Sequence, residues 1–203
     1  MSKNTKPNRN GRILLTMLLL FGAPYLFAWY FFFSGTALEI GNSSNRGNLV
    51  SPMQPMPEVQ YQLHDGTQVT SAELADHWLM ITVADGCDDL CGQALIIMQQ
   101  SRRAQAVNRQ YIKRMLVLTS AQDQAEDIAA KYQGTLVATA VEANGADAMP
   151  ALLSAFEGLE AQQQGSIYLV DPRSNVMMTY NSDMPRDNLL KDMERLFKVI
   201  KMD

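Results

Sequence analysis

Hydrophobic residues form one long run near the N-terminus of this sequence and many short runs after it. Residues 13–33 carry no charged side chain, and residues 78–83 are apolar at every position except Thr82. A short, almost continuous apolar run is typical of a central parallel strand, which is buried on both faces. Apolar positions then recur at helical spacing over residues 89–108, so we expect a long helix after that strand.

The rest of the pattern predicts further strands and helices in alternation. Residues 59–63 and 67–69 read as a hairpin around Asp65-Gly66, and Thr70 with Glu73 matches a capping box. Strands that alternate with helices pair in parallel through right-handed crossovers. The expected fold is α/β and thioredoxin-like, a mixed sheet flanked by helices. Its later strands are expected at 115–119, 135–141, 166–170 and 176–180, and its later helices at 121–132, 150–158 and 185–200.

The uncharged run at residues 13–33 is long enough to cross a bilayer, whose core needs about 20 residues. Lys3, Lys6, Arg9 and Arg12 precede it, and the next cation is Arg46. This asymmetry predicts that the N-terminus lies in the cytoplasm and the rest of the chain outside it. We therefore expect a cytoplasmic tail at 1–12, a transmembrane helix at 13–33, a tether at 34–57 and the thioredoxin-like domain at 58–203.

A cleaved signal peptide is the alternative interpretation of the N-terminal run. Signal peptides have apolar regions of about 7–15 residues that end in small side chains. The run here is longer and ends in Phe31-Phe32-Phe33, which favours an uncleaved anchor. The following stretch is rich in Gly, Asn and Ser over 41–47 and has three prolines over 52–57, so it is expected to be extended and to contribute nothing to the core.

Charge narrows the range of partners. Residues 34–203 carry 13 Lys and Arg against 21 Asp and Glu, an excess of eight negative charges. An acidic domain argues against nucleic acid and against an anionic lipid surface as ligands. It is compatible with a cationic protein partner.

Cys87 and Cys91 are the only cysteines in the sequence, and they lie where the predicted strand at 78–83 gives way to the predicted helix. Spaced at i and i+4, both sulfurs are expected on one face of the first helical turn. A disulfide that closes so small a loop removes little entropy from the unfolded chain, so structural stabilisation is a weak reason for this pair. A redox or metal-binding role is the better interpretation.

The residues around the two thiols are expected to act on the thiol pKa in opposite directions. The positive end of a helix dipole stabilises a thiolate, whereas Asp85, Asp88 and Asp89 raise the pKa of a nearby thiol. Asp88 or Asp89 is also a suitable N-cap for the helix. If the thiols bind a metal, their softness favours Cu(I), with imidazole as a common additional ligand.

The sequence resembles the Sco/SenC family in its Cys-x-x-x-Cys motif after a central strand and in Tyr168-Leu169-Val170-Asp171-Pro172 before the last hairpin. Residues 45–52 and 63–66 are more similar still to single-span proteins of Gram-negative bacteria found with haem–copper oxidase assembly factors. The resemblance implies a thioredoxin-fold copper chaperone, anchored in the inner membrane with its domain in the periplasm. Its implied cofactor is Cu(I) at Cys87 and Cys91, and its implied partners are cytochrome c oxidase subunits or other assembly factors.

The sequence also departs from the Sco/SenC pattern. Asp88 replaces the proline that follows the first cysteine, and Gln163 stands at about the position of the copper-binding histidine. His64 and His77, the two histidines present, both precede the cysteines. The proline that thioredoxins place before the corresponding strand is missing too. The third metal ligand is therefore unknown.

Three hypotheses follow from these residues. The chain delivers copper through Cys87 and Cys91, or it is a thiol–disulfide oxidoreductase that controls partner cysteines, or it is an anchored scaffold whose cysteines form an inert disulfide. His64 and His77 are expected to be surface or capping residues, and Met53 and Met56 are weak candidates for thioether ligands. Four arginines are expected to form a solvated face or, less readily, a patch for an acidic partner: Arg102, Arg103, Arg109 and Arg114.

Overall fold

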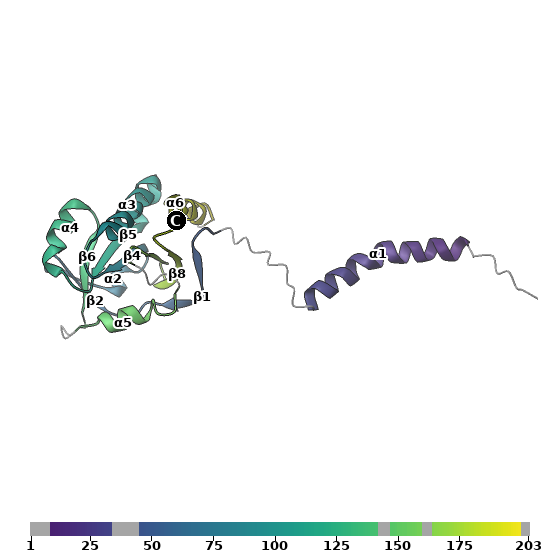
Figure 1. The fold of residues 1–203 in the computed structure, drawn as a ribbon, viewed down its shortest axis with the longest axis horizontal. Helices are drawn as coiled ribbons and strands as arrows, with labels where there is room; N and C mark the ends of the chain where they lie inside the picture. The colour runs from purple at the N-terminus through teal and green to yellow at the C-terminus, as the bar shows by residue number, and fades with distance from the viewer. Residues whose placement is uncertain (1–8, 34–44, 142–146, 160–163, 200–203) are drawn as a thin grey trace, which may run out of the picture. The chain divides into compact units, whose positions relative to one another are not determined.

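The structure, a computed structural model of the 203-residue chain, describes residues 9–33, 45–141, 147–159 and 164–199 (Figure 1). The chain divides into two units, Met1–Ser44 and Asn45–Asp203. The first unit contains α1 (Arg9–Phe33), a helix with Pro24 in its interior. Among the described residues, no helix combines the length and the apolar character needed to cross a membrane. The transmembrane helix expected at 13–33 therefore stays a prediction.

The described part of the second unit is built on an eight-stranded sheet in the order β1-β8-β7-β4-β5-β6-β2-β3. The three central strands β4, β5 and β6 are parallel, and the other neighbouring pairs are antiparallel. This is the mixed sheet that the sequence predicts. The strands are β1 (Asn48–Pro55), β2 (Gln60–Leu63), β3 (Gln68–Thr70), β4 (Trp78–Ala84), β5 (Ile112–Leu118), β6 (Leu136–Val141), β7 (Ile167–Val170) and β8 (Asn175–Tyr180).

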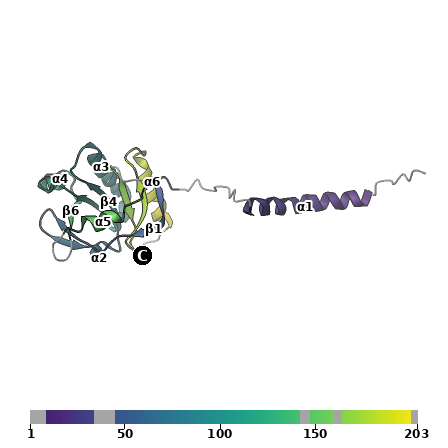
Figure 2. The ribbon, with the colours of Figure 1, turned by 60° about the horizontal axis from the view of Figure 1, so that its bottom comes forward.

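Helices cover both faces of the sheet (Figures 1 and 2). On one face, α3 (Asp89–Ala104), α4 (Ala125–Lys131) and α6 (Asp187–Val199) pack over Met80 and Leu116. On the other, α2 (Ser71–Leu74) and α5 (Met149–Ser154) pack over Ile81 and Val117. Successive residues of one strand point to opposite faces, so the apolar run in β4 supplies both halves of the core.

The local turn and cap signals of the sequence are confirmed. β2 and β3 form the expected antiparallel hairpin, and Gly66 adopts the positive φ of 83° that its turn requires. Thr70 and Glu73 form the reciprocal bonds of a capping box at the start of α2. Both signals depend on residues within three positions of each other, which explains why the sequence was sufficient to predict them.

The expectation of a featureless tether over 34–57 is wrong for residues 48–55. They form β1, which pairs with β8 at the edge of the sheet, and Val50 is buried in the core. Proline is tolerated on an edge strand, because one side of that strand has no neighbour for an N–H to bond. A proline-rich extended segment can therefore also be a strand. Residues 34–44 lie outside the described residues.

Two helix boundaries also differ from the prediction. The helix expected at 89–108 ends at Ala104 and is followed by η1, a 3₁₀ helix over Ala106–Tyr111. The helix expected from 121 begins as a 3₁₀ turn, and α4 starts only at Ala125. Ala106 and Ala121 each have a φ of 47°, a left-handed conformation that interrupts a regular helix and that periodicity does not reveal.

Candidate functional site

The Cys turn, residues 85–88, connects the carboxyl end of β4 to α3. Asp88 is the N-cap of α3, and its side chain accepts a hydrogen bond from the backbone N–H of Cys91 at 2.9 Å. This bond fixes where the helix begins and holds Cys91 in its first turn. The predicted capping role of Asp88 is therefore confirmed.

Cys87 and Cys91 form a disulfide, with their Cα atoms 5.1 Å apart. Cys87 precedes the N-cap, so the expectation that both sulfurs lie on one helical face is wrong: the non-helical Asp88 turns the chain between them. The two sulfurs differ in access, since Cys91 is fully buried and Cys87 is half-buried. Cys87 is therefore the more accessible of the two cysteines.

The loop before β7 packs against the first turn of α3. Gly165 has a φ of +82°, and a Cβ there would lie 3.0 Å from the Leu90 carbonyl oxygen. Gln164 donates to the Asp85 carboxylate at 2.6 Å, and the Thr82 hydroxyl donates to the Ser166 carbonyl at 2.8 Å. These contacts hold the Cys turn to a loop about eighty residues later. Sequence reasoning missed them, although a glycine before a buried strand is a signal of close backbone approach.

Neither histidine lies near the disulfide. His77 precedes the seven-residue strand β4, whose opposite end carries the Cys turn, so roughly 23 Å of strand separates it from Cys87. His64 follows β2, which is three strands away from β4, a lateral distance of roughly 14 Å. His64 is exposed, and the ring Nδ1 of His77 lies 3.1 Å from the Ala75 carbonyl oxygen. His64 is therefore a surface residue, as predicted, and His77 is a half-buried residue beside the backbone of Ala75, which ends α2.

The two methionines of the expected tether also lie at the other end of the sheet. Met53 is in β1, and the backbone N–H of Met56 donates to the Ser174 carbonyl at 2.8 Å, beside the start of β8. That end of β8 is next to the end of β7, which pairs with the start of β4 at Leu79. Gln163 lies outside the described residues. Within the part of the chain that is described, no three His, Cys, Asp or Glu side chains are grouped to hold a metal ion.

The arginines near α3 do not form a single solvated face. Arg114 is buried in β5 and donates to the Gln133 carbonyl at 2.8 Å, while Arg102 Nε donates to the Ile112 carbonyl at 2.7 Å. Burial, and then repulsion from Arg102 and Arg103, lowers the pKa of Arg114 to about 10. Arg102 and Arg114 therefore connect the helices to the sheet, and an acidic partner has no direct access to Arg114.

A groove opens beside Cys87 between α3 and α4. It has a volume of about 800 Å³, and the residues that line it include Cys87, Asp88, Asp89, Asp127 and Tyr132. Gly92 permits the close approach of the two helices, because a Cβ there would lie 2.8 Å from the Tyr132 hydroxyl. The residues from α4 were not predicted, since they follow Cys87 by about forty positions in the chain.

The sequence over residues 78–200 matches a family model described as "Transmembrane-like, thioredoxin-like, C-terminal domain". This chain belongs to that family. The match begins at β4 and includes the Cys turn, α3 and the last hairpin. A comparison with curated proteins finds no match.

Solved structures similar to this member of the family include Sco proteins. BsSco, described as a member of the Sco family of cytochrome c oxidase assembly proteins, is 17% identical with a TM-score of 0.54, covering 73% of this chain and 96% of its own. ScoI of Arabidopsis thaliana with copper bound is 13% identical with a TM-score of 0.54, covering 71% and 99%.

A third similar structure comes from outside the Sco proteins. A thiol:disulfide interchange protein from Bacteroides sp. is 11% identical with a TM-score of 0.56, covering 75% of this chain and 94% of its own. At such identities the likeness shows the fold. The thioredoxin-like fold and the resemblance to Sco/SenC proteins in structure are thereby confirmed.

Proposed function

We propose that this protein controls the redox state of thiols during cytochrome c oxidase assembly, with Cys87 as the attacking thiol and Cys91 as the resolving thiol. The observation that carries the proposal is the unequal access of the two cysteines. Cys87 is half-buried beside a groove and can react with the partner, whereas Cys91 is fully buried and can react only with Cys87. The structural likeness to Sco assembly proteins and to a thiol:disulfide interchange protein supports the same function.

The exchange proceeds in two balanced steps. The Cys87 thiolate of the reduced protein attacks a disulfide of the partner, forms a mixed disulfide and releases the first partner thiolate. The Cys91 thiolate then attacks Cys87 Sγ, releasing the second partner thiolate and forming the Cys87–Cys91 disulfide. Two electrons pass from this protein to the partner. A dithiol protein that reduces the Cys87–Cys91 disulfide must restore the starting state.

The proposed setting is the periplasmic side of the inner membrane, with residues 13–33 as a single-pass anchor and the N-terminus in the cytoplasm. The uncharged stretch and the four cations before it support this placement. The family's description as transmembrane-like is in keeping with it.

Copper delivery is a second candidate function, favoured by the copper-bound state of a structure with the same fold. Reduction of Cys87 and Cys91 would provide two soft thiolates for Cu(I) as cargo. The described residues do not complete a three-ligand site, since His64 and His77 lie elsewhere in the sheet. A third ligand would come from outside the described residues or from the partner, or would be absent. Anaerobic titration of the reduced full-length protein with Cu(I) against a competing chelator tests this candidate, which fails if the protein takes no copper from the chelator.

The decisive test replaces both cysteines in the organism that encodes the protein. We expect Cys87→Ser/Cys91→Ser to abolish or sharply reduce assembled cytochrome c oxidase, measured by its haem spectrum and oxygen consumption at equal levels of the variant protein. His64→Ala is the matched control, because His64 is exposed and remote from the disulfide, and it should leave assembly unchanged. Full assembly in the double variant would exclude both thiol functions and leave the scaffold hypothesis.

A further inference from the structure

The groove beside Cys87 has an uneven charge. Three acidic residues line it, Asp88, Asp89 and Asp127, and all three are exposed. Among the described residues of its walls, Lys131 alone carries a positive charge, and its ammonium lies 5.2 Å from the centre of the Tyr132 ring. The groove therefore presents a net negative surface next to the accessible sulfur.

The floor of the groove contains apolar side chains against which a partner can pack. Ile128 and Tyr132 are buried in it, while Ile96 on the α3 side remains 39% exposed. Apolar side chains surrounded by a polar rim are typical of a surface that binds another protein. Since Cys91 is fully buried, a segment that exchanges with the disulfide must place its sulfur against Cys87.

We propose that this groove receives a protein segment in which the exchanging cysteine is flanked by lysine or arginine. An incoming thiolate is an anion, and the three carboxylates repel it. Cations beside the partner cysteine offset that repulsion, lower the pKa of the partner thiol and speed the encounter by electrostatic attraction. The inference rests on the proposed thiol exchange at Cys87 and specifies the class of dithiol protein that reduces the Cys87–Cys91 disulfide.

Small thiols of different charge test the proposal on the full-length protein in a neutral detergent. The probes are cysteamine, 2-mercaptoethanol and 3-mercaptopropionate, which carry a positive, a neutral and a negative group beside the thiol. Each thiol reduces the Cys87–Cys91 disulfide, and free cysteines are trapped at intervals with a maleimide that shifts the protein on a gel. Each rate is divided by the rate of the same thiol with a neutral small disulfide, which removes differences in thiol pKa and nucleophilicity.

We expect the corrected rate for cysteamine to exceed that for 3-mercaptopropionate about tenfold at low ionic strength. The preference should shrink to about twofold in 1 M salt, where the screening length falls to roughly 3 Å. Asp127→Asn should reduce the preference, and Lys131→Gln should increase it, because both side chains line the groove.

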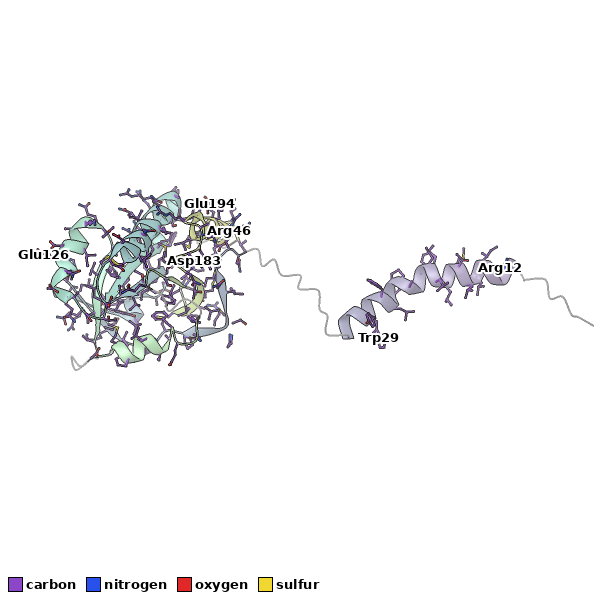
Figure 3. The ribbon with its side chains drawn as sticks, in the orientation of Figure 1. Arg12, Trp29, Arg46, Glu126, Asp183 and Glu194 are labelled. Atoms are coloured by element: carbon purple, nitrogen blue, oxygen red, sulfur yellow. A yellow bond between two sulfur atoms is a disulfide. The ribbon has the colours of Figure 1, made fainter. Side chains whose placement is uncertain are left out.

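Glu126→Gln is the matched control. Glu126 shares the first turn of α4 with Asp127, is exposed, and lies at the outer edge of the domain, away from the groove walls (Figure 3). The same loss of one negative charge at this position should leave the preference nearly unchanged. An equal reduction of the preference by both substitutions would overturn the assignment to the groove.

The remaining outcomes separate this inference from the proposed function. Equal corrected rates for the three thiols, or faster reduction by the anionic one, would refute a cationic partner while leaving thiol exchange intact. A disulfide that no thiol reduces unless the protein is first unfolded would overturn both, because the bond would then be structural.

Discussion

Asp192 is an acidic residue that the domain buries, and it holds the start of the second unit in place. Its carboxylate accepts hydrogen bonds from the backbone N–H of Arg46 and of Gly47 at 2.8 and 2.9 Å, and from the Tyr180 hydroxyl at 3.1 Å. Gly47 packs so closely on the Tyr180 ring that a Cβ there would lie 2.5 Å from it. This contact fixes the segment that leads into β1, which sequence reasoning had placed in a tether.

Asp192→Ala should therefore destabilise the domain by about 2–4 kcal/mol, because the buried Gly47 N–H and Tyr180 hydroxyl lose their acceptor, as does the part-buried Arg46 N–H. The measurement is the free energy of unfolding in urea for the full-length protein. Glu194→Ala, at an exposed position two residues later in α6 (Figure 3), is the control and should change stability by less than about 0.5 kcal/mol. Similar losses in the two variants would show that the carboxylate contacts contribute little.

At the scale of elements, the packing of α3 against α4 shapes the groove beside Cys87. Gly92 lies in the first part of α3, and the Tyr132 hydroxyl occupies the space that a side chain there would take. Glycine inside a helix costs about 1 kcal/mol relative to alanine, so close packing has been retained at the expense of helix propensity.

A double-mutant cycle measures this contact. Gly92→Ala alone should be neutral or destabilising, because the new methyl group meets the Tyr132 hydroxyl at 2.8 Å. In a Tyr132→Phe background the hydroxyl is gone, and the same substitution should stabilise the protein by up to about 1 kcal/mol. The unfolding free energies of the four proteins give the coupling energy between position 92 and the Tyr132 hydroxyl. A coupling energy of zero would mean that the methyl group and the hydroxyl do not obstruct each other.

At the scale of the whole molecule, buried tyrosines make the folded state sensitive to alkali. Burial raises the pKa of Tyr61 and of Tyr168 to about 12, and burial together with the Asp192 carboxylate raises the pKa of Tyr180 further. Tyrosine in an unfolded chain has a pKa near 10. Between pH 10 and pH 12 the unfolded chain loses phenolic protons that the folded protein keeps, so stability falls as pH rises.

Arg114 acts in the opposite direction, because its lowered pKa means that the folded protein loses that proton first. One such group is outweighed by three tyrosines. We expect the urea midpoint to decrease steadily above pH 10, and Tyr168→Phe should make that decrease shallower, whereas Tyr111→Phe at a partly exposed tyrosine is the matched control. A midpoint that is constant up to pH 12 would contradict the buried positions of these phenols.

Residues close together in the chain determined a large part of this protein before any contact was known. The apolar run of β4, the β2–β3 hairpin, the capping box at Thr70 and the N-cap at Asp88 were all predicted. Each depends on periodicity or on hydrogen bonds spanning a few residues. The position of the two cysteines at the end of a central strand followed from the same reasoning, and so did the α/β class.

Long-range contacts decided the rest. Residues 48–55 form a strand because they pair with β8 at the edge of the sheet. Gln164 and Gly165 lie beside the Cys turn and the start of α3 because β7 pairs with β4. The order of strands separated His64 and His77 from the disulfide and brought beside it Asp127 of α4 and Tyr132, the residue that ends this helix. Periodicity along one segment contains no information on which segments become neighbours, since that depends on how the sheet and helices bury their apolar faces together.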